Sequence, residues 1–279
     1  MAQETQFDLV IIGSGPGGYV AAVRAAQLDL KTAVVEKSSR LGGVCLNVGC
    51  IPSKAMLDAS EYFHLAKDRF AEYGIKTGTV ALDLPAMLAR KDKVVEDLTE
   101  NVRKLLEGNN IEIIHGSATV TAPGTVEVDT GKKKKLALSA KNILLATGSE
   151  PIEVKGLEFD GERIVSSTEA LSFDSVPEHL GIVGGGYIGL ELGSVWNRLG
   201  SKVTVIEMLP KIAAGLDGQV GRTLDRILKR QGMEFRLSTR VAKATVSGKK
   251  VKAVLQKGDD SEEMTFDRLL VSIGRRPLT

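Results

Sequence analysis

The sequence predicts an α/β protein in which two similar units of parallel strands and helices follow one another along the chain. Two observations predict this fold class. A buried strand, a glycine-rich turn, an amphipathic helix and a second strand ending in an acid occur in this order near the N-terminus, and again from residue 179 onward. The 279 residues also suffice for two domains of ordinary size. We therefore expect one domain over residues 1–150 and a second over residues 151–279.

The first unit starts with the apolar run FDLVII at residues 7–12, which predicts a buried parallel strand. The glycine-rich turn after it leads into a helix, and the strand KTAVVEK then ends in Glu36. Such glycines permit a tight turn and a close approach to a pyrophosphate, which the N–H groups of the helix start can bind. The acid about 20 residues later can accept a hydrogen bond from a ribose hydroxyl. The pattern is typical of a Rossmann-like dinucleotide site.

The second unit repeats each part. HLGIVGGG ends a strand at Gly184, a helix follows over residues 187–200, and KVTVIE ends in Glu207. A carboxylate here suits a free 2′-hydroxyl and repels a 2′-phosphate, so the second site is expected to prefer NAD to NADP. Two dinucleotides in one chain indicate electron transfer between them, with FAD in the first unit and NAD in the second. The alternative is two glycine-rich turns without ligands, which two complete copies disfavour.

Between the two units the sequence predicts helices at residues 55–72 and 85–107, and then short strands that form a small β-meander. Each domain would therefore have three layers. The run Lys132–Lys135 is expected to be a solvated hairpin turn. NILLATGSEP, residues 142–151, predicts a buried strand that leads into a turn of small residues close to a ligand.

The net charge of +2 is too small to indicate a nucleic-acid partner. The first residues lack the basic start of a secretory signal, and no apolar stretch is long enough to span a bilayer. We therefore expect a cytoplasmic protein without membrane contact. In that compartment two cysteines rarely form a structural bridge and more often serve redox or metal chemistry.

The two cysteines, Cys45 and Cys50, flank a short loop, and CIPSK at residues 50–54 predicts a helix start. The helix dipole and Lys54 favour the thiolate, which is the reactive form in disulfide exchange. A metal site would need further ligands, and the three histidines form no ligand cluster. A structural disulfide would be unusual in the expected compartment. A redox-active pair beside the flavin is the favoured interpretation, and no metal is expected.

The stretch GGVCLNVGCIPSK at residues 42–54, with the first dinucleotide unit before it, resembles the flavin disulfide oxidoreductases of the pyridine-nucleotide group. Within this group, CLNVGCIPSK, GGGYIGLELG and SIGRRPLT resemble the dihydrolipoamide (lipoamide) dehydrogenases. Glutathione and mercuric reductases typically carry valine at the positions of Leu46 and Ile51. The resemblance covers the whole chain.

The resemblance implies a role for each chemical residue. Cys45 would be the interchange thiol that meets the substrate, and Cys50 would lie over the flavin as the charge-transfer thiolate. Lys54 would lie near flavin N5 with Glu191 as its ion-pair partner. Tyr187 would shield the flavin until nicotinamide displaces it, or would be a packing residue at a helix start; spacing does not distinguish these two interpretations.

The resemblance also implies the residues that hold the cofactors. FAD would be held by Gly13, Gly15, Gly18, Glu36, Lys37, Gly42, Gly43, Val44, Cys45, Lys54, Gly116, Thr147, Gly148 and Ser149. NAD would be held by Gly184, Gly185, Gly186, Tyr187, Ile188, Gly189, Glu191, Glu207, Val241 and Gly274.

The implied activity is oxidation of protein-bound dihydrolipoamide to lipoamide with NAD⁺, through the disulfide and FAD. The implied partner is a lipoyl domain or lipoyl carrier protein of a 2-oxo acid dehydrogenase or glycine cleavage complex, and the full-length enzyme would be a homodimer. No nucleic acid is expected as a partner.

The chain departs from the family in one respect. The family's base is a histidine paired with a glutamate near the C-terminus of longer chains, contributed by the partner subunit, and none of His64, His115 and His179 lies in a matching segment. The C-terminal dimerisation domain is likewise absent from this chain, so a polypeptide ending at Thr279 is expected to be inactive in lipoamide turnover. A related glutathione or mercuric reductase, and a non-catalytic nucleotide-binding fragment, remain as alternatives.

Overall fold

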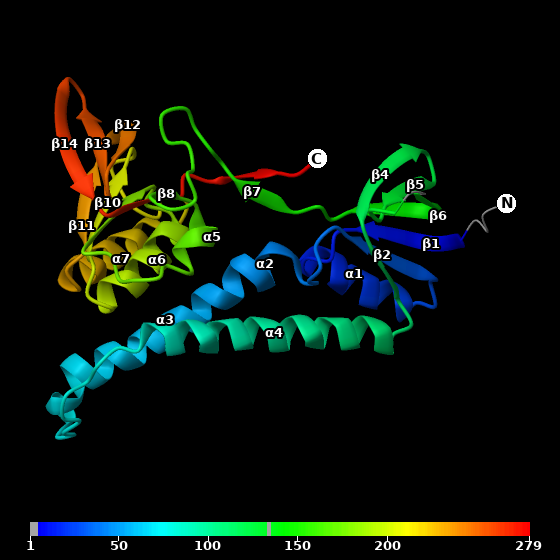
Figure 1. The fold of residues 1–279 in the computed structure, drawn as a ribbon, viewed down its shortest axis with the longest axis horizontal. Helices are drawn as coiled ribbons and strands as arrows, with labels where there is room; N and C mark the ends of the chain where they lie inside the picture. The colour runs from blue at the N-terminus through cyan, green and yellow to red at the C-terminus, as the bar shows by residue number, and fades with distance from the viewer. Residues whose placement is uncertain (1–4, 133–134) are drawn as a thin grey trace. The chain divides into compact units, whose positions relative to one another are not determined.

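The structure is a computed structural model that describes residues 5–132 and 135–279 (Figure 1). Packing divides the chain into two compact units. The first unit consists of the chain up to Pro52, Asp92–Glu150 and Pro277–Thr279, and the second consists of Ser53–Lys91 and Pro151–Arg276. Each unit has its own sheet and its own apolar core.

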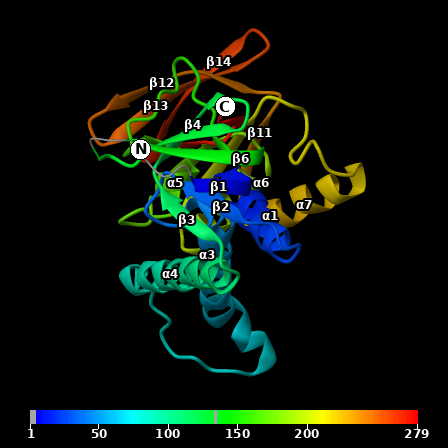
Figure 2. The same ribbon diagram turned by 90° about the vertical axis from the view of Figure 1, so that its right-hand side faces the viewer.

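The first unit is built on a six-stranded sheet with the order β3-β2-β1-β6-β5-β4. Its strands are β1 (Thr5–Ile12), β2 (Thr32–Glu36), β3 (Glu112–His115), β4 (Ser117–Ala122), β5 (Thr125–Asp129) and β6 (Leu136–Leu145). The first three and β6 are parallel, and β4 and β5 form an antiparallel meander. Helix α1 (Pro16–Ala26) lies on one face of the parallel strands in Figures 1 and 2, and the meander lies on the other.

Alternating side chains of the parallel strands explain these layers, because successive residues of a strand point to opposite faces. Ile11 and Val34 pack with Ala22 of α1 and Leu106 of the long helix α4 (Leu84–Gly108). Their neighbours along the strands pack on the other face with the meander, forming the set Phe7, Val10, Ala33, Val35, Val126 and Val128. Burial on both faces accounts for the continuous apolar runs.

The second unit repeats this plan around a five-stranded parallel sheet with the order β11-β10-β9-β15-β8. Its strands are β8 (Ile164–Val165), β9 (His179–Val183), β10 (Lys202–Glu207), β11 (Glu234–Leu237) and β15 (Arg268–Val271). Helices α5 (Ser167–Ala170), α6 (Tyr187–Arg198) and α7 (Gly218–Arg230) belong to this unit. A separate antiparallel sheet of β12 (Arg240–Ser247), β13 (Lys250–Lys257) and β14 (Asp260–Phe266) packs on the other face through a second apolar cluster. The predicted fold class, with two Rossmann-like units, is confirmed.

Four short elements and one longer helix complete the chain. They are α2 (Gly43–Val48), α3 (Cys50–His64), the π-helical turn Leu65–Arg69, the 3₁₀ turn Phe70–Tyr73, and a two-stranded sheet of β7 (Ser149–Pro151) and β16 (Arg275–Pro277). The helix predicted over residues 55–72 therefore leaves α-helical geometry after His64, whereas the helix predicted over 85–107 is α4.

The packing units differ from two contiguous halves of the chain. Residues 53–91, which include most of α3 and the start of α4, belong to the second unit because Met56 and Leu84 are buried in its core. Lys91 at the edge of this segment donates to Ser172 Oγ at 2.8 Å. This division follows packing, and it does not test the predicted assignment of residues 1–150 to FAD and 151–279 to NAD.

The segment predicted as a buried strand at residues 142–151 is the end of β6, and its burial was predicted wrongly. Leu144 and Leu145 are exposed by 36% and 65%. These residues lie where β6 leaves the core, so their apolar character indicates a strand but not its depth. The predicted turn at Lys132–Lys135 includes residues 133 and 134, which lie outside the described residues; β5 and β6 on either side of it are antiparallel.

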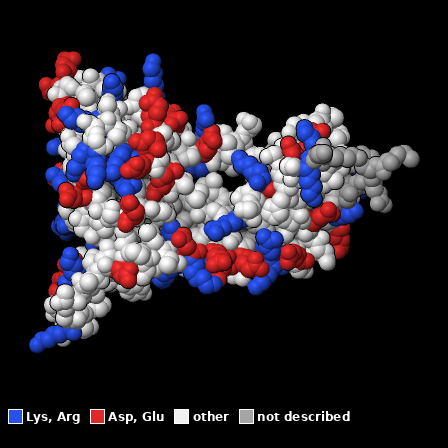
Figure 3. Space-filling model, in the orientation of Figure 1, with Lys and Arg blue, Asp and Glu red and all other residues white. Residues whose placement is uncertain are grey.

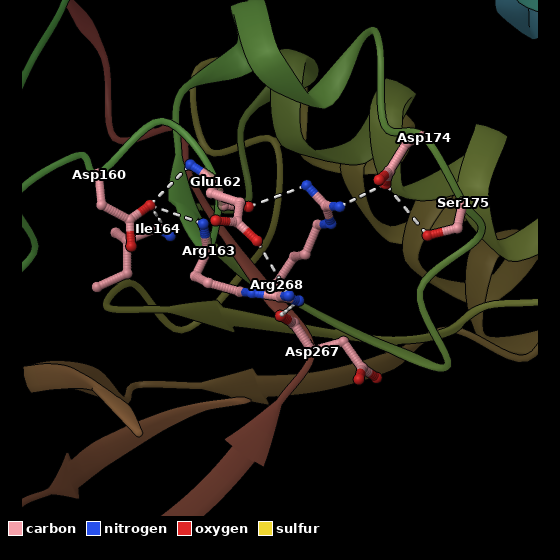
Figure 4. A network of polar contacts seen from close by, with 8 residues as sticks. All are labelled: Asp160, Glu162, Arg163, Ile164, Asp174, Ser175, Asp267 and Arg268. Atoms are coloured by element: carbon pink, nitrogen blue, oxygen red, sulfur yellow. Dashed lines mark hydrogen bonds and ion pairs between the residues drawn. The ribbon is translucent and has the colours of Figure 1, made fainter. Parts of the chain in front are cut away.

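A polar network in the second unit attaches β8 and the loop before it to β15 (Figure 4). Arg268 donates to the Glu162 carbonyl oxygen at 2.9 Å and to Asp174 Oδ1 at 2.6 Å, and its guanidinium lies 4.5 Å from the Phe173 ring centre. Asp160 Oδ1 accepts three backbone N–H groups from the same loop. These contacts fix the outer strand of the sheet.

On the face shown in Figure 3, acidic and basic side chains are interspersed. Along α4 the opposite charges pair locally, as in Lys93–Asp97 and Arg103–Glu100. Within the described part of the chain, none of the helices combines the length and the apolar character that a membrane span requires.

Candidate dinucleotide and redox site

The first glycine-rich turn joins β1 to α1 and has two positions that accept only glycine. Gly13 has φ of +104°, and a Cβ there would lie 2.3 Å from the Ala146 carbonyl oxygen. A Cβ on Gly18 would lie 1.9 Å from the Gly13 carbonyl oxygen. The helix therefore starts directly against the strand, with Gly15 as N-cap and Pro16 in the first turn. This brings the N–H groups of a helix start to the end of the sheet, where a pyrophosphate can bind them.

The acid at the end of β2 organises this turn. Glu36 is 7% exposed, and its Oε2 accepts from the backbone N of Ser14 at 2.9 Å and from Ser14 Oγ at 2.6 Å. Its Oε1 accepts from the Ser38 N–H at 2.8 Å. Since a carboxylate accepts about four hydrogen bonds, a ribose hydroxyl can still join these three donors. Glu36 thus holds the turn and keeps capacity for a ligand.

The loop before the cysteines packs closely against the glycine-rich turn. Gly42 N–H donates to Ser14 Oγ at 3.1 Å, and a Cβ on Gly43 would lie 2.7 Å from the Gly15 Cα. No side chain therefore fits between the two segments at this point. A surface formed by glycine backbone at a helix start is what close approach of a pyrophosphate requires.

Asn47 lies between the two cysteines and has one polar atom without a protein partner. Its Nδ2 donates to the carbonyl oxygens of Leu41 and Gly43, both at 2.9 Å. Its Oδ1 is buried and accepts no hydrogen bond in the structure. A buried acceptor of this kind normally has a donor, so a ligand hydroxyl or N–H fits here. Together with the glycine surface, the residues present fit a dinucleotide such as FAD.

The cysteines occupy the two helices that follow this loop. Cys45 is half-buried within α2, and Cys50 is exposed as the first residue of α3, so the predicted helix start at CIPSK is confirmed. Gly49 separates the helices, and a Cβ there would lie 2.9 Å from the Val44 carbonyl oxygen. Which thiol meets substrate and which faces flavin stays a prediction.

Lys54 lies one helical turn after Cys50, and the predicted ion pair with Glu191 is present. Its Nζ lies 2.7 Å from each carboxylate oxygen of Glu191 on α6. The Ser53 hydroxyl donates to the same carboxylate at 3.4 Å. The side chains of Lys54 and Glu191 are exposed by 58% and 31%, so this pair alone contributes little stability. Its position beside a flavin stays a prediction.

The second glycine-rich turn joins β9 to α6 in the same way. Gly184 also has φ of +104°, and a Cβ on Gly189 would lie 2.6 Å from the Gly184 carbonyl oxygen. Glu207 accepts from the N–H of Gly185 at 2.6 Å and of Leu209 at 2.7 Å. The residues present fit a second dinucleotide, here one with a free ribose hydroxyl.

Tyr187 is the first residue of α6, and 72% of it is exposed. Such exposure disfavours the interpretation of Tyr187 as a packing residue at a helix start. Its role as a shield of the flavin is not tested by this geometry and stays a prediction.

Several of the other predicted cofactor residues follow the carboxyl ends of parallel strands. In the first unit Lys37 follows β2, Gly116 follows β3 and Thr147–Gly148 follow β6, while Val44 lies at the start of α2. The Gly116 N–H donates to the Glu36 carbonyl oxygen at 2.9 Å. In the second unit Gly274 follows β15 and Val241 lies in β12. Ligands of open α/β sheets bind at the carboxyl edge, where the predicted residues that follow parallel strands lie, and their contact with a cofactor stays a prediction.

The three histidines each have a local partner. His64 Nδ1 lies 2.9 Å from Asp68, His115 Nδ1 lies 2.9 Å from the Ser38 carbonyl oxygen, and His179 Nε2 lies 2.9 Å from Thr204 Oγ1. Burial of His179, with Lys202 nearby, lowers its pKa. Over residues 5–132 and 135–279 we find no cluster of three His, Cys, Asp or Glu side chains that could hold a metal.

Sequence reasoning missed Ser14, Asn47 and Arg198. Ser14 and Asn47 stand inside recognised motifs, and Ser14, as a polar residue between two glycines, could have indicated a buried contact. Arg198 gave no such signal, because its partner Glu61 is remote in the sequence: the two side chains meet at 2.6 Å between α6 and α3.

A family model, curated proteins and solved structures that match this chain all belong to disulfide oxidoreductases. Residues 7–279 match the family model described as pyridine nucleotide-disulphide oxidoreductase. The chain is 47% identical over 274 residues to "Dihydrolipoyl dehydrogenase 2, mitochondrial" of Arabidopsis thaliana, covering 98% of this chain and 54% of that protein. It is 48% identical over 276 residues to "Dihydrolipoyl dehydrogenase 3" of Pseudomonas putida, covering 98% and 59%. The solved structure of the HOCl-induced flavoprotein disulfide reductase RclA from Escherichia coli is 28% identical with a TM-score of 0.80, covering 98% of this chain and 57% of that one.

The expectation of a cytoplasmic location is overturned by these relatives. The matching dihydrolipoyl dehydrogenases of Arabidopsis thaliana, Pisum sativum and Caenorhabditis elegans are named mitochondrial. The expectation rested on the lack of a secretory signal and of a membrane-spanning stretch, and these two observations do not distinguish the cytoplasm from an organelle.

The chain spans about half the length of the curated relatives that it matches. Over that span the family match includes both glycine-rich turns, the cysteine pair and both sheets. The match leaves only the first six residues outside it, and the chain therefore belongs to the pyridine nucleotide-disulphide oxidoreductases.

Proposed function

We propose that this chain supplies the redox-active disulfide, the FAD site and the NAD site of a dihydrolipoyl dehydrogenase. The observation that carries the proposal is the position of the cysteine pair: Cys50 starts α3, and the Lys54–Glu191 pair follows one turn later. Support comes from relatives of that name, which are 44–48% identical over 98% of the chain. The enzyme would oxidise protein-bound dihydrolipoamide to lipoamide with NAD⁺.

Membership of the family implies FAD and NAD as cofactors, and it makes the chain part of a flavoprotein oxidoreductase. We assign residues 1–150, with the cysteine pair, to FAD and residues 151–279 to NAD. The first turn, Glu36 and the loop that Asn47 holds would bind and orient FAD. The second turn and Glu207 would bind NAD through its phosphates and its ribose.

The cysteines would exchange disulfides with the substrate. A thiolate of dihydrolipoamide attacks Cys45 Sγ, the Cys45–Cys50 bond breaks, and Cys50 leaves as a thiolate. The second substrate thiol then attacks the substrate sulfur of the mixed disulfide, which forms lipoamide and releases Cys45. Bound FAD would accept the electron pair of the two thiols, and NAD⁺ would carry it away as hydride.

Two protons must leave the substrate dithiol in this exchange, so the reaction needs a base. We propose that the base is the family's histidine from a second subunit of a homodimer. The three histidines of this chain support this choice, because each already contacts a local partner. Lipoyl domains or lipoyl carrier proteins of 2-oxo acid dehydrogenase or glycine cleavage complexes would present the substrate.

A redox partner other than lipoamide is the second candidate. Proteins named leghemoglobin reductase, of Glycine max and Vigna unguiculata, are 44% and 46% identical to this chain. These sequence identities overlap with those of the dihydrolipoyl dehydrogenases. Sequence identity therefore does not show which redox partner this protein uses.

Turnover by the full-length protein tests the proposal. We expect NAD⁺-dependent oxidation of dihydrolipoamide that is abolished by Cys45→Ser and by Cys50→Ser, with the flavin retained in both variants. Cys50→Ser should also remove the long-wavelength charge-transfer absorption of the two-electron-reduced protein, whereas Cys45→Ser should keep it. Faster turnover of glutathione disulfide would favour the second candidate, and a purified protein without flavin absorption would contradict both.

A further inference from the structure

Two ion pairs join α3 to α6, and they are spaced by seven residues on both helices. Lys54 meets Glu191 at 2.7 Å, and Glu61 meets Arg198 at 2.6 Å. All four residues belong to the second unit. Seven residues correspond to about two helical turns, so the two contacts lie on the same side of each helix and occur in the same order along both. The signs are opposite: α3 contributes the cation to the first pair and the anion to the second.

The second pair is the more enclosed of the two. The Arg198 side chain is 16% exposed, compared with 58% for Lys54. Arg198 Nη1 also donates to the Leu57 carbonyl oxygen at 3.4 Å, which ties the guanidinium to the backbone of α3. A planar guanidinium holds such a geometry better than the flexible ammonium of a lysine. Arg198 therefore restrains the helix itself, whereas Lys54 contacts only a side chain.

Apolar packing defines the rotation of α3 only coarsely. Met56 is buried in the same core as Leu190 of α6, and Leu57 packs against that core from a partly buried position. A large rotation of α3 would carry Met56 out of the core, whereas apolar contacts are non-directional and tolerate small rotations. Directional hydrogen bonds such as those of Arg198 can limit these small rotations. Arg198 is also the last residue of α6, where a positive charge complements the carbonyl end of the helix.

We propose that Glu61–Arg198 is a positioning pair, which sets the rotation of α3 against α6 that places Lys54 on Glu191. The link to the flavin rests on the proposed function, in which Lys54 lies beside flavin N5. The placement of Lys54 on Glu191 is independent of that function.

The test uses three variants of the full-length protein. Arg198→Met removes both contacts to α3, and Glu61→Gln removes only the carboxylate, at a 43% exposed position that a folded protein tolerates. Asp58→Asn is the matched control. Asp58 is a 47% exposed carboxylate of the same helix, and it pairs at 3.0 Å with Arg90 of α4 instead of with α6.

The first measurement is the acetylation rate of Lys54 by acetic anhydride, followed by mass spectrometry on the purified protein. The Lys54 nitrogen is held by hydrogen bonds to both carboxylate oxygens of Glu191, and these must break before the nitrogen can attack the reagent. We expect acetylation to be about two- to five-fold faster in Arg198→Met and Glu61→Gln, the range expected for loss of an exposed ion pair, and unchanged in Asp58→Asn. In a Glu191→Gln background the two variants should cause no further acceleration, since the effects act through one contact.

The second measurement is the midpoint potential of the bound flavin. Glu191→Gln leaves Lys54 as an unbalanced positive charge, so we expect the potential to rise, and to rise in the same direction in Arg198→Met. An unchanged midpoint potential in Glu191→Gln would show that the flavin does not lie beside Lys54. In that case the acetylation rates of Lys54 still decide whether Glu61–Arg198 is a positioning pair. Lower thermal stability with unchanged Lys54 acetylation in both variants would overturn the proposal and show a purely structural pair.

Discussion

The two glycine-rich turns share one backbone framework, and their residues correspond at a constant offset of 171 positions. Gly13 and Gly184 both have φ of +104°, and their N–H groups donate to Val35 and Ile206 of the neighbouring strands at 2.8 and 2.9 Å. Further on, the N–H groups of Gly42 and Ala213 donate to the carbonyl oxygens of Ser14 and Gly185 at 3.1 and 2.8 Å. The same local chemistry therefore produces the same turn twice.

One difference between the turns adds a hydrogen-bonding side chain to the framework. Ser14 in the first turn adds a hydroxyl that bridges Glu36 and the Gly42 N–H. The second turn has Gly185 there, and Glu207 receives only backbone donors and is more exposed than Glu36. The first carboxylate is thus bound into the protein, and the second is the more available to a ligand.

The segments that leave the framework differ more. After Gly42 the first unit continues into α2 and α3 with both cysteines, whereas after Ala213 the second unit continues into α7, which lacks cysteine. The comparison teaches that the redox chemistry was added to a loop of a common nucleotide-binding unit, consistent with function residing in sites placed on a shared fold.

The largest effect is expected from the closest approach in the first turn. Gly18→Ala places a Cβ 1.9 Å from a backbone oxygen, so we expect about 3 kcal/mol of destabilisation and loss of bound flavin. Gly189→Ala, with a 2.6 Å approach, should behave similarly but more mildly. Denaturant unfolding and the flavin-to-protein absorbance ratio measure both effects.

Gly17→Ala is the control for this prediction, because no atom lies within 4 Å of its Cβ position. Equal losses in Gly17→Ala and Gly18→Ala would show that sequence position, and not the backbone approach, determines the effect.

The next effect concerns the difference between Ser14 and Gly185. Ser14→Ala removes the hydroxyl from the buried Glu36 carboxylate, and a buried group that loses one partner costs about 1–3 kcal/mol. We expect that loss in unfolding free energy and weaker FAD binding, while NAD binding stays unchanged. Isothermal titration with each cofactor measures the two sites separately, and a parallel loss at both would break the comparison.

A third prediction concerns the more exposed acid. Glu207→Gln removes the charge that repels a 2′-phosphate, and we expect the preference for NAD over NADP in kcat/KM to fall about ten-fold, or about 1.4 kcal/mol. Glu36→Gln is the comparison variant and should leave this ratio unchanged. A wild-type protein that prefers NADP would show that the argument from the carboxylate is wrong.

The smallest effect is the acid sensitivity of the two units. Burial raises the pKa of Asp160, but the N–H groups of Glu162, Arg163 and Ile164 lower it more, so the net pKa is below its usual value. The Lys141 side chain, followed by the Lys31 N–H, lowers the pKa of Asp8 in the first unit. A depressed carboxyl pKa contributes stability above the unfolded-state value of about 3.9, and this stability is lost as pH falls through the folded-state pKa.

Thermal unfolding between about pH 2 and 6 measures this contribution, since the shifts lie around the unfolded carboxyl pKa. Asp160→Asn and Asp8→Asn should each flatten the acid limb of the melting temperature. Added salt should weaken the effect of Asp8, which depends on an exposed lysine, more than that of Asp160. Identical salt dependence in the two variants would contradict this distinction.

Both turns, both acids and the cysteine pair were readable from the sequence by itself. In each case the interacting residues are close along the chain: Ser14 and Glu36 are 22 positions apart, and a glycine with positive φ leaves a local mark. The apolar run at residues 7–12 likewise predicted a buried parallel strand, because a strand that is covered on both faces is apolar along most of its length.

Only the tertiary structure decided which unit α3 joins, how far β6 is buried and which residues hold α3 on α6. Lys54 and Glu191 are 137 positions apart, and Glu61 and Arg198 have the same separation. The first pair was predicted from a family resemblance, and the second was not predicted. A long-range contact between two helices leaves no periodic or local pattern, since it depends on how both helices pack and rotate after the chain has folded.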